Sequence, residues 1–95
     1  MLDEKYIKII KEIVSSYGKE RQVLQSIEEM SELTKELLKN INRNKDNKTE
    51  ITLEIADVII MIIQLVDIYG IDREKILGAI EYKLLRQEER MEKNE

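Results

Sequence analysis

The segment from residue 49 to residue 69 restricts the fold of this chain more than any other feature. Its apolar residues leave almost no polar face on a helix: Ile51, Leu53, Ile55, Val58, Ile59, Ile60, Met61, Ile62, Ile63, Leu65, Val66 and Ile68. A helix that is apolar all round is buried on all sides. Its uninterrupted apolar runs are far shorter than the ~20 residues that cross a bilayer. The segment therefore predicts a helix buried in an assembly of helices, and no membrane partner.

The first half of the chain predicts two amphipathic helices. Apolar residues recur at steps of three and four over residues 3–17, and Gly18 is expected to close this helix in a left-handed conformation. The same spacing continues over about residues 20–41, which predicts a second helix with one apolar arc. Residues 42–48 are polar and typical of turns, so an exposed loop is expected there.

The second half supplies the buried helix and a fourth one. Thr49 is the expected N-cap of the buried helix, which stops at Gly70, and Asp72 is the expected N-cap of a fourth helix that runs into a charged tail at about 88–95. Four helices with short connections predict a single all-α domain over residues 1–95, a four-helix bundle. A chain of 95 residues buries only a modest core. We therefore expect the bundle to be completed by oligomerisation, as a homodimer or homotetramer.

Composition excludes several classes of function. The chain has no Cys and no His, which removes thiol nucleophiles, Ser-His-Asp triads, ordinary zinc sites and disulfides. The formal net charge is −4 with acids and bases interspersed, so no basic stripe for a nucleic-acid backbone is present and no nucleic-acid partner is expected. The first residues turn acidic at once and do not have the pattern of a signal peptide, which predicts a cytoplasmic protein.

Two carboxylates of the most apolar helix, Glu54 and Asp57, are unfavourable there without compensation. They share one narrow strip of this helix with Glu50 and Gln64. An ionised carboxylate in such surroundings is costly unless a cation or several donors accompany it. If the second and third helices pack through their apolar arcs, Glu29 and Glu32 approach this strip. Four converging carboxylates require a divalent cation to stay ionised together.

The ligand set indicates which cation. Hard oxygen ligands without imidazole or thiolate suit magnesium, with manganese as the alternative. Di-iron bundles use a Glu-x-x-His motif, and the absence of His excludes them. A pair of magnesium ions ~3.5–4 Å apart is suited to clamping a phosphoryl group during hydrolysis. The other interpretation of the acids on the second helix, taken alone, is an ordinary solvated face.

Two short motifs resemble a known family of enzymes. Residues 28–33, with the sequence EEMSEL, and residues 54–58, with the sequence EIADV, resemble the E-E-x-x-E and E-x-x-D signature of MazG-like nucleoside triphosphate pyrophosphohydrolases. The resemblance covers roughly residues 17 to 90. It implies an all-α fold, an obligate dimer or dimer of dimers, and hydrolysis of a (deoxy)nucleoside triphosphate to the monophosphate and pyrophosphate.

The resemblance also implies roles for individual residues. The implied magnesium ligands are Glu29, Glu32, Glu54 and Asp57. Glu28 would orient or deprotonate the attacking water, Lys83 and Arg86 would neutralise phosphate oxygens, and Gln25 is a candidate for contacts with the substrate.

The chain departs from the family at one position. Many relatives carry Asp or Asn one turn beyond the second motif, where this chain has Ile60 and Met61, and the next polar group on the strip is Gln64. Gln64 then has three roles open to it: a hydrogen bond to a ligand carboxylate, a contact with the nucleotide, or a cross-link in the core. Two other functions remain open for the chain, a non-catalytic helical interaction module and a nucleotide-binding sensor without turnover.

Overall fold

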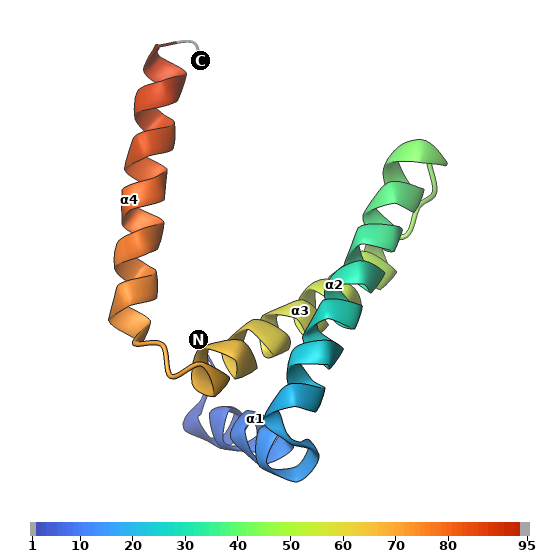
Figure 1. The fold of residues 1–95 in the computed structure, drawn as a ribbon. Helices are drawn as coiled ribbons and strands as arrows, with labels where there is room; N and C mark the ends of the chain where they lie inside the picture. The colour runs from blue at the N-terminus through green and yellow to red at the C-terminus, as the bar shows by residue number, and fades with distance from the viewer. Residues whose placement is uncertain (1, 94–95) are drawn as a thin grey trace.

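The computed structural model describes residues 2–93, which form four α-helices and no strand. The helices are α1 (Glu4–Tyr17), α2 (Lys19–Asn42), α3 (Lys48–Ile68) and α4 (Arg73–Glu92) (Figure 1). The predicted all-α class is confirmed, and the first three predicted helices are present within one or two residues of their expected bounds. α4 begins as predicted but continues to Glu92, through most of the segment that we expected to fray from about residue 88.

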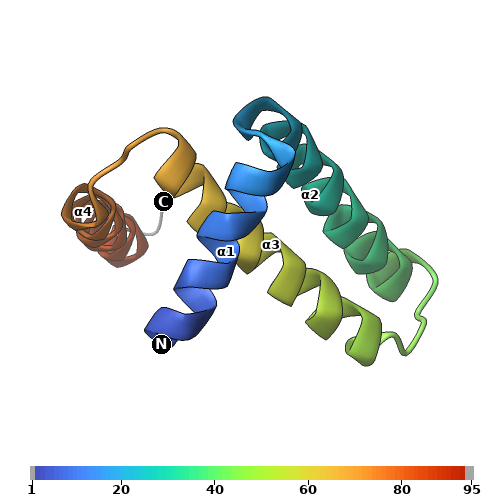
Figure 2. The ribbon, with the colours of Figure 1, turned by 90° about the horizontal axis from the view of Figure 1, so that it is seen from below.

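Three of the helices pack together, and the fourth extends away from them. α2 and α3 form a helical hairpin, and α1 lies across the C-terminal half of α3 and the beginning of α2 (Figures 1 and 2). α4 stands apart in both views, and its residues are exposed except for the half-buried Ile76. The helices α1 to α3 thus form a bundle of three, and the predicted fourth member, α4, does not pack into it within this chain.

Local sequence explains how α3 ends and α4 begins. Gly70 has φ 62°, and the N–H groups of Gly70 and Ile71 donate to the carbonyls of Asp67 and Val66 at 3.1 and 3.0 Å. This pair of bonds is the Schellman motif, which favours glycine at the left-handed position. Two residues later, the Asp72 side chain accepts a hydrogen bond from the Glu74 N–H at 3.1 Å. Both predicted signals, the stop at Gly70 and the cap at Asp72, are confirmed.

Two predicted helix ends differ from the structure. Gly18 has φ 95° and ψ 149°, which is outside the left-handed helical region that we predicted, although its N–H does donate to the Val14 carbonyl at 2.8 Å. Gly18 is the single residue between α1 and α2, so the chain must also turn sharply there. The N-cap position of α3 is Asn47, two residues before the predicted Thr49, because Asn47 is held by contacts with α2.

The interior is small and largely polar. The buried apolar residues are Ile10, Val14 and Met61, whereas the buried polar residues are Gln22, Ser26, Asn47 and Gln64. The prediction that α2 packs on α3 through its apolar arc is wrong, since much of that arc is exposed, including Leu24, Ile27, Leu38 and Ile41. The flank that carries Gln22, Ser26 and Glu29 is turned inward instead. Among residues 2–93, no helix has the length and the hydropathy that crossing a membrane demands.

Candidate metal centre between α2 and α3

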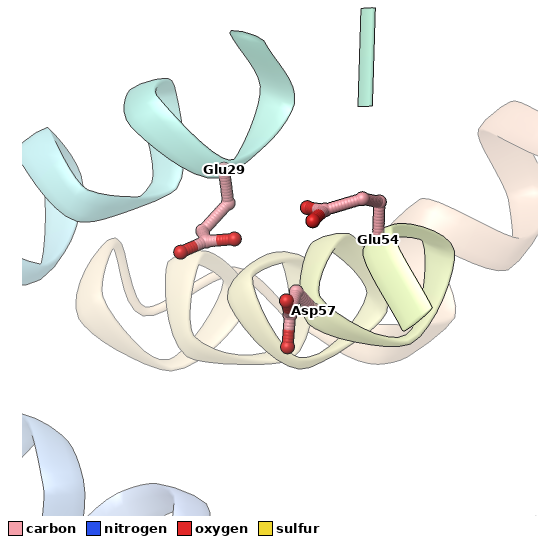
Figure 3. A group of neighbouring side chains, drawn as sticks. All are labelled: Glu29, Glu54 and Asp57. Atoms are coloured by element: carbon pink, nitrogen blue, oxygen red, sulfur yellow. The ribbon is translucent and has the colours of Figure 1, made fainter. Parts of the chain in front are cut away.

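Three carboxylates from two helices meet where α2 faces α3. Glu29 comes from α2, while Glu54 and Asp57 come from adjacent turns of α3 (Figure 3). Each offers one oxygen, and the three oxygens lie within 4.8 Å of one another. We call these residues the acidic triad. The approach of Glu29 to Glu54 and Asp57 is therefore as predicted, although a different face of α2 produces it.

Glu54 bears most of the electrostatic cost of this arrangement. Burial raises the pKa of the Glu54 carboxyl above its ordinary value, and the negative charges of Asp57, Glu29, Glu32 and Glu36 raise it further. Its Oε2 atom is buried and has no hydrogen-bond partner among the described residues. Both observations follow from holding a carboxylate away from water beside others of the same charge. A bound cation would remove both penalties.

Glu29 is held in place by its own helix. The Gln25 side-chain amide donates to Glu29 Oε1 at 2.9 Å across one turn of α2. A donor of this kind orients a carboxylate that binds a metal and keeps its second oxygen available. Gln25, which we considered for contact with the substrate, therefore contacts a residue of the acidic triad instead.

The other two predicted acids of α2 lie beside the acidic triad and outside it. Glu32 is half-buried, and Lys35 contacts its Oε1 at 3.4 Å. Its charge nevertheless contributes to the raised pKa of Glu54, so it lies within electrostatic range. Glu28 is exposed on α2 next to Glu29. The structure thus brings together three of the four predicted metal ligands and leaves the fourth and Glu28 at the edge.

The predicted substrate-binding residues are divided between two very different places. Lys83 and Arg86 are exposed on α4, which stands away from the acidic triad in this chain (Figure 1). Gln64 is fully buried on α3, and in the described part of the chain neither atom of its amide has a hydrogen-bond partner. Of the ion pairs among residues 2–93, none reaches the acidic triad.

Sequence reasoning did not identify Asn47, the residue that links α3 to α2 near the loop of the helical hairpin. The Asn47 amide is completely buried and donates to both the backbone carbonyl and the Oε1 of Glu36, at 2.8 and 2.9 Å. Its own oxygen accepts from Asn40 at 3.2 Å. The hydrogen bonds from Asn47 and Lys39 lower the pKa of Glu36. An Asn just before a helix was the available signal, but its partner eleven residues earlier depends on how the two helices meet.

Chemically, the acidic triad fits a hard divalent cation. It offers only carboxylate oxygens, drawn from two helices, and one of those oxygens is buried without a partner. Comparisons of the chain with protein-family models, with curated proteins and with solved structures found no match. The chemistry of these residues is therefore the basis on which a function can be assigned.

Proposed function

We propose that this chain is a magnesium-dependent nucleoside triphosphate pyrophosphohydrolase of the MazG-like type. The substrate would be a (deoxy)nucleoside triphosphate, cleaved by water between the α and β phosphorus atoms to give the monophosphate and pyrophosphate. The observation that carries this proposal is the acidic triad, with the unpartnered Oε2 of Glu54 inside it. The motifs at residues 28–33 and 54–58, which resemble the family signature, contain all three acids of the acidic triad, and also Glu28 and Glu32 at its edge.

The residues in and around the acidic triad have two proposed roles, metal binding and proton transfer. Glu29, Glu54 and Asp57 would hold magnesium, or manganese in its place, and Glu32, which now contacts Lys35, would be the fourth ligand. The ion would neutralise phosphate charge. Glu28 lies on the exposed side of α2, where water has access, and it orients or deprotonates the attacking water. Gln25 keeps Glu29 in position.

A homodimer or homotetramer is part of the proposal. Exposed apolar side chains cover the outer side of α3 and much of α4, among them Leu53, Ile59, Leu77 and Leu84. Apolar surface that is exposed and contiguous marks an interaction site in a globular protein, and the exposed apolar side chains of these two helices support one here. Association would also give α4 a surface to pack on, and with it a position for Lys83 and Arg86 near phosphates. We place the protein in the cytoplasm, where its substrates are found.

The direct test is incubation with the eight common ribo- and deoxyribonucleoside triphosphates and magnesium, followed by product analysis. We expect monophosphate and pyrophosphate, and no product in the presence of a chelator. The matched variants are Glu54→Gln, which removes a charge from the acidic triad, and Glu50→Gln, which removes one from an exposed acid one turn earlier on α3. Glu54→Gln should abolish turnover, whereas Glu50→Gln should retain it.

Each other result points to a different function. Diphosphate and inorganic phosphate as products would contradict the proposed cleavage site. Magnesium-dependent nucleotide binding without any product would indicate a sensor. No binding and no turnover would leave the helical interaction module, in which the acidic seam only sets which helices pair.

A further inference from the structure

Beyond the acidic triad, the most deeply buried side chains of α2 and α3 include a polar group that has no partner. Gln22 and Ser26 are the buried residues of α2, and Met61 and Gln64 are those of α3. The Ser26 hydroxyl is satisfied, because it donates to the Val23 carbonyl at 2.6 Å. The Gln64 side chain is 1% exposed, and neither its amide nitrogen nor its amide oxygen has a partner among residues 2–93. Such a group is unfavourable in a folded protein unless something else satisfies it.

The position of Gln64 relative to the acidic triad indicates which kind of ligand satisfies its amide. Gln64 follows Asp57 by seven residues, so it lies on the same strip of α3, two turns and roughly 10 Å further along the axis. On α2, Gln22 precedes Glu29 by the same seven residues. Because the two helices run in opposite directions, equal steps away from the acidic triad bring Gln22 and Gln64 to the same level of the seam. This is the level at which α1 lies over the hairpin (Figures 1 and 2).

A nucleotide has the length and the chemistry to bridge these two places. Its phosphates and the hydrogen-bonding edge of its base are separated by one ribose, a span comparable with two turns of helix. A glutamine amide presents a donor and an acceptor side by side, which matches the adjacent donor and acceptor on a base edge. The strip of α3 therefore carries a metal-binding end and a base-binding end at a fitting separation.

We propose that the Gln64 amide is the group that recognises the base of the nucleotide whose phosphates bind at the acidic triad. This inference rests on the proposed function, because it requires a nucleotide at the acidic triad. Gln64 is a specificity residue in this scheme and takes no part in the reaction. Since its side chain is covered, the scheme requires α1, which is joined to α2 by Gly18 alone, to move aside when the base binds.

The experiment compares the wild type with Gln64→Met, which keeps the size of the side chain and removes its amide. Calorimetric titration in magnesium would use α,β-methylene analogues of the four ribonucleoside triphosphates, together with ribose 5-triphosphate, which has no base. The wild type should bind its preferred base roughly tenfold or more tightly than the other bases or ribose triphosphate. Gln64→Met should lose that preference and bind ribose triphosphate as the wild type does. With hydrolysable substrate, KM should rise and kcat should be unchanged.

Ser26→Ala is the matched control, because Ser26 is buried on the same seam and satisfied by its own helix. It should leave the base preference intact. If Gln64→Met folds poorly, Gln64→Asn keeps an amide on a shorter arm and should lose the preference in the same way. Retention of the base preference in both Gln64 variants would overturn the inference. A wild type that prefers one base and releases no pyrophosphate would refute the proposed activity and leave the inference standing.

Discussion

The seam between α2 and α3 and the outer surface of α4 reverse the usual distribution of polar and apolar residues. In the seam, Gln22, Ser26 and Gln64 are buried, and three carboxylates meet further along it. On α4, Leu77 and Leu84 are 61% and 64% exposed. Burial of polar groups without partners opposes folding, and exposure of large apolar groups forgoes stabilisation. These features are the basis of our proposals that the seam binds a ligand and that the outer surface binds another copy of the chain.

This difference also separates two sources of stability. Burying a large apolar side chain stabilises a fold by about 1.5–3 kcal/mol, so a partner that covers α4 contributes strongly. The acidic triad contributes in the opposite direction until a cation binds, because its like charges repel and two of its members, Glu29 and Glu54, are half-buried, while Asp57 is exposed. We therefore expect the stability of the protein to depend on association at one surface and on magnesium at the other.

The largest effect should come from charging the apolar surface of α4. The double substitution Leu77→Glu and Leu84→Glu removes about 3–6 kcal/mol of apolar burial in an assembly, if each side chain contributes its usual amount. Light scattering at micromolar concentration should show an oligomer for the wild type and a monomer for the variant. Lys75→Glu, an exposed change on the same helix, is the control and should stay oligomeric. Equal masses for wild type and double variant would show that α4 is not part of the interface.

A smaller but still large effect is expected from Asp57→Asn in the acidic triad. Partners that only orient a metal ligand usually contribute 10–100-fold, so loss of the ligand itself should reduce activity by roughly 100-fold or more. Without metal, the variant should melt no lower than the wild type, because one of the repelling charges has gone. It should also lose most of the stabilisation that magnesium confers by binding the native state.

Melting curves in magnesium and in chelator distinguish a metal-binding role of Asp57 from a structural one. Asp67→Asn, an exposed change on the same helix, is the control and should respond to magnesium as the wild type does. A large loss of stability of Asp57→Asn in chelator would argue against a metal role. Breaking a buried ion pair, by comparison, costs ~3–5 kcal/mol with or without metal.

How far the sequence predicts this molecule depends on the range of the interaction. The C-terminal end of α3 and the beginning of α4 were predictable, since Gly70 and Asp72 act through bonds to near neighbours. The meeting of Glu29 with Glu54 and Asp57 was also predictable. Carboxylates on an apolar helix require a cation or hydrogen-bond donors, and a cation requires further ligands, which α2 carries. The face of α2 that turns inward was not, since an apolar arc shows that a helix has a partner and does not show which one. The position of α4 was not predictable for the same reason: its apolar residues show that it has a partner and do not show which one.

The next prediction concerns Gln25, which supports the acidic triad from behind. Gln25→Met removes the donor that lies 2.9 Å from Glu29 Oε1 and keeps a side chain of similar length. We expect magnesium affinity to fall about tenfold, the lower end of what such supporting residues contribute. Titration with magnesium, followed through the melting temperature, measures this. Gln25→Glu also removes the donor but adds a fourth negative charge, which attracts the cation, so its magnesium affinity should exceed that of Gln25→Met. Unchanged affinity in both variants would assign Gln25 to packing alone.

The smallest effect should be the dependence of metal-free stability on pH, which follows from Glu54. The folded state raises the pKa of this carboxyl, chiefly through burial, above the ordinary value of 4.5. The folded protein therefore binds the proton more tightly than the unfolded chain does, and stability is lost as the pH rises from 4.5 through the folded pKa. In chelator, mild acidification from neutral pH should accordingly raise the melting temperature.

Glu54→Gln should melt higher than the wild type at neutral pH and lose this part of the pH dependence. The effect should be modest because Glu54 is only half-buried, so solvent screens its neighbours' charges. A wild type that becomes less stable over the same range, with Glu54→Gln melting lower at neutral pH, would mean that the ionised Glu54 is stabilised by a partner in the fold.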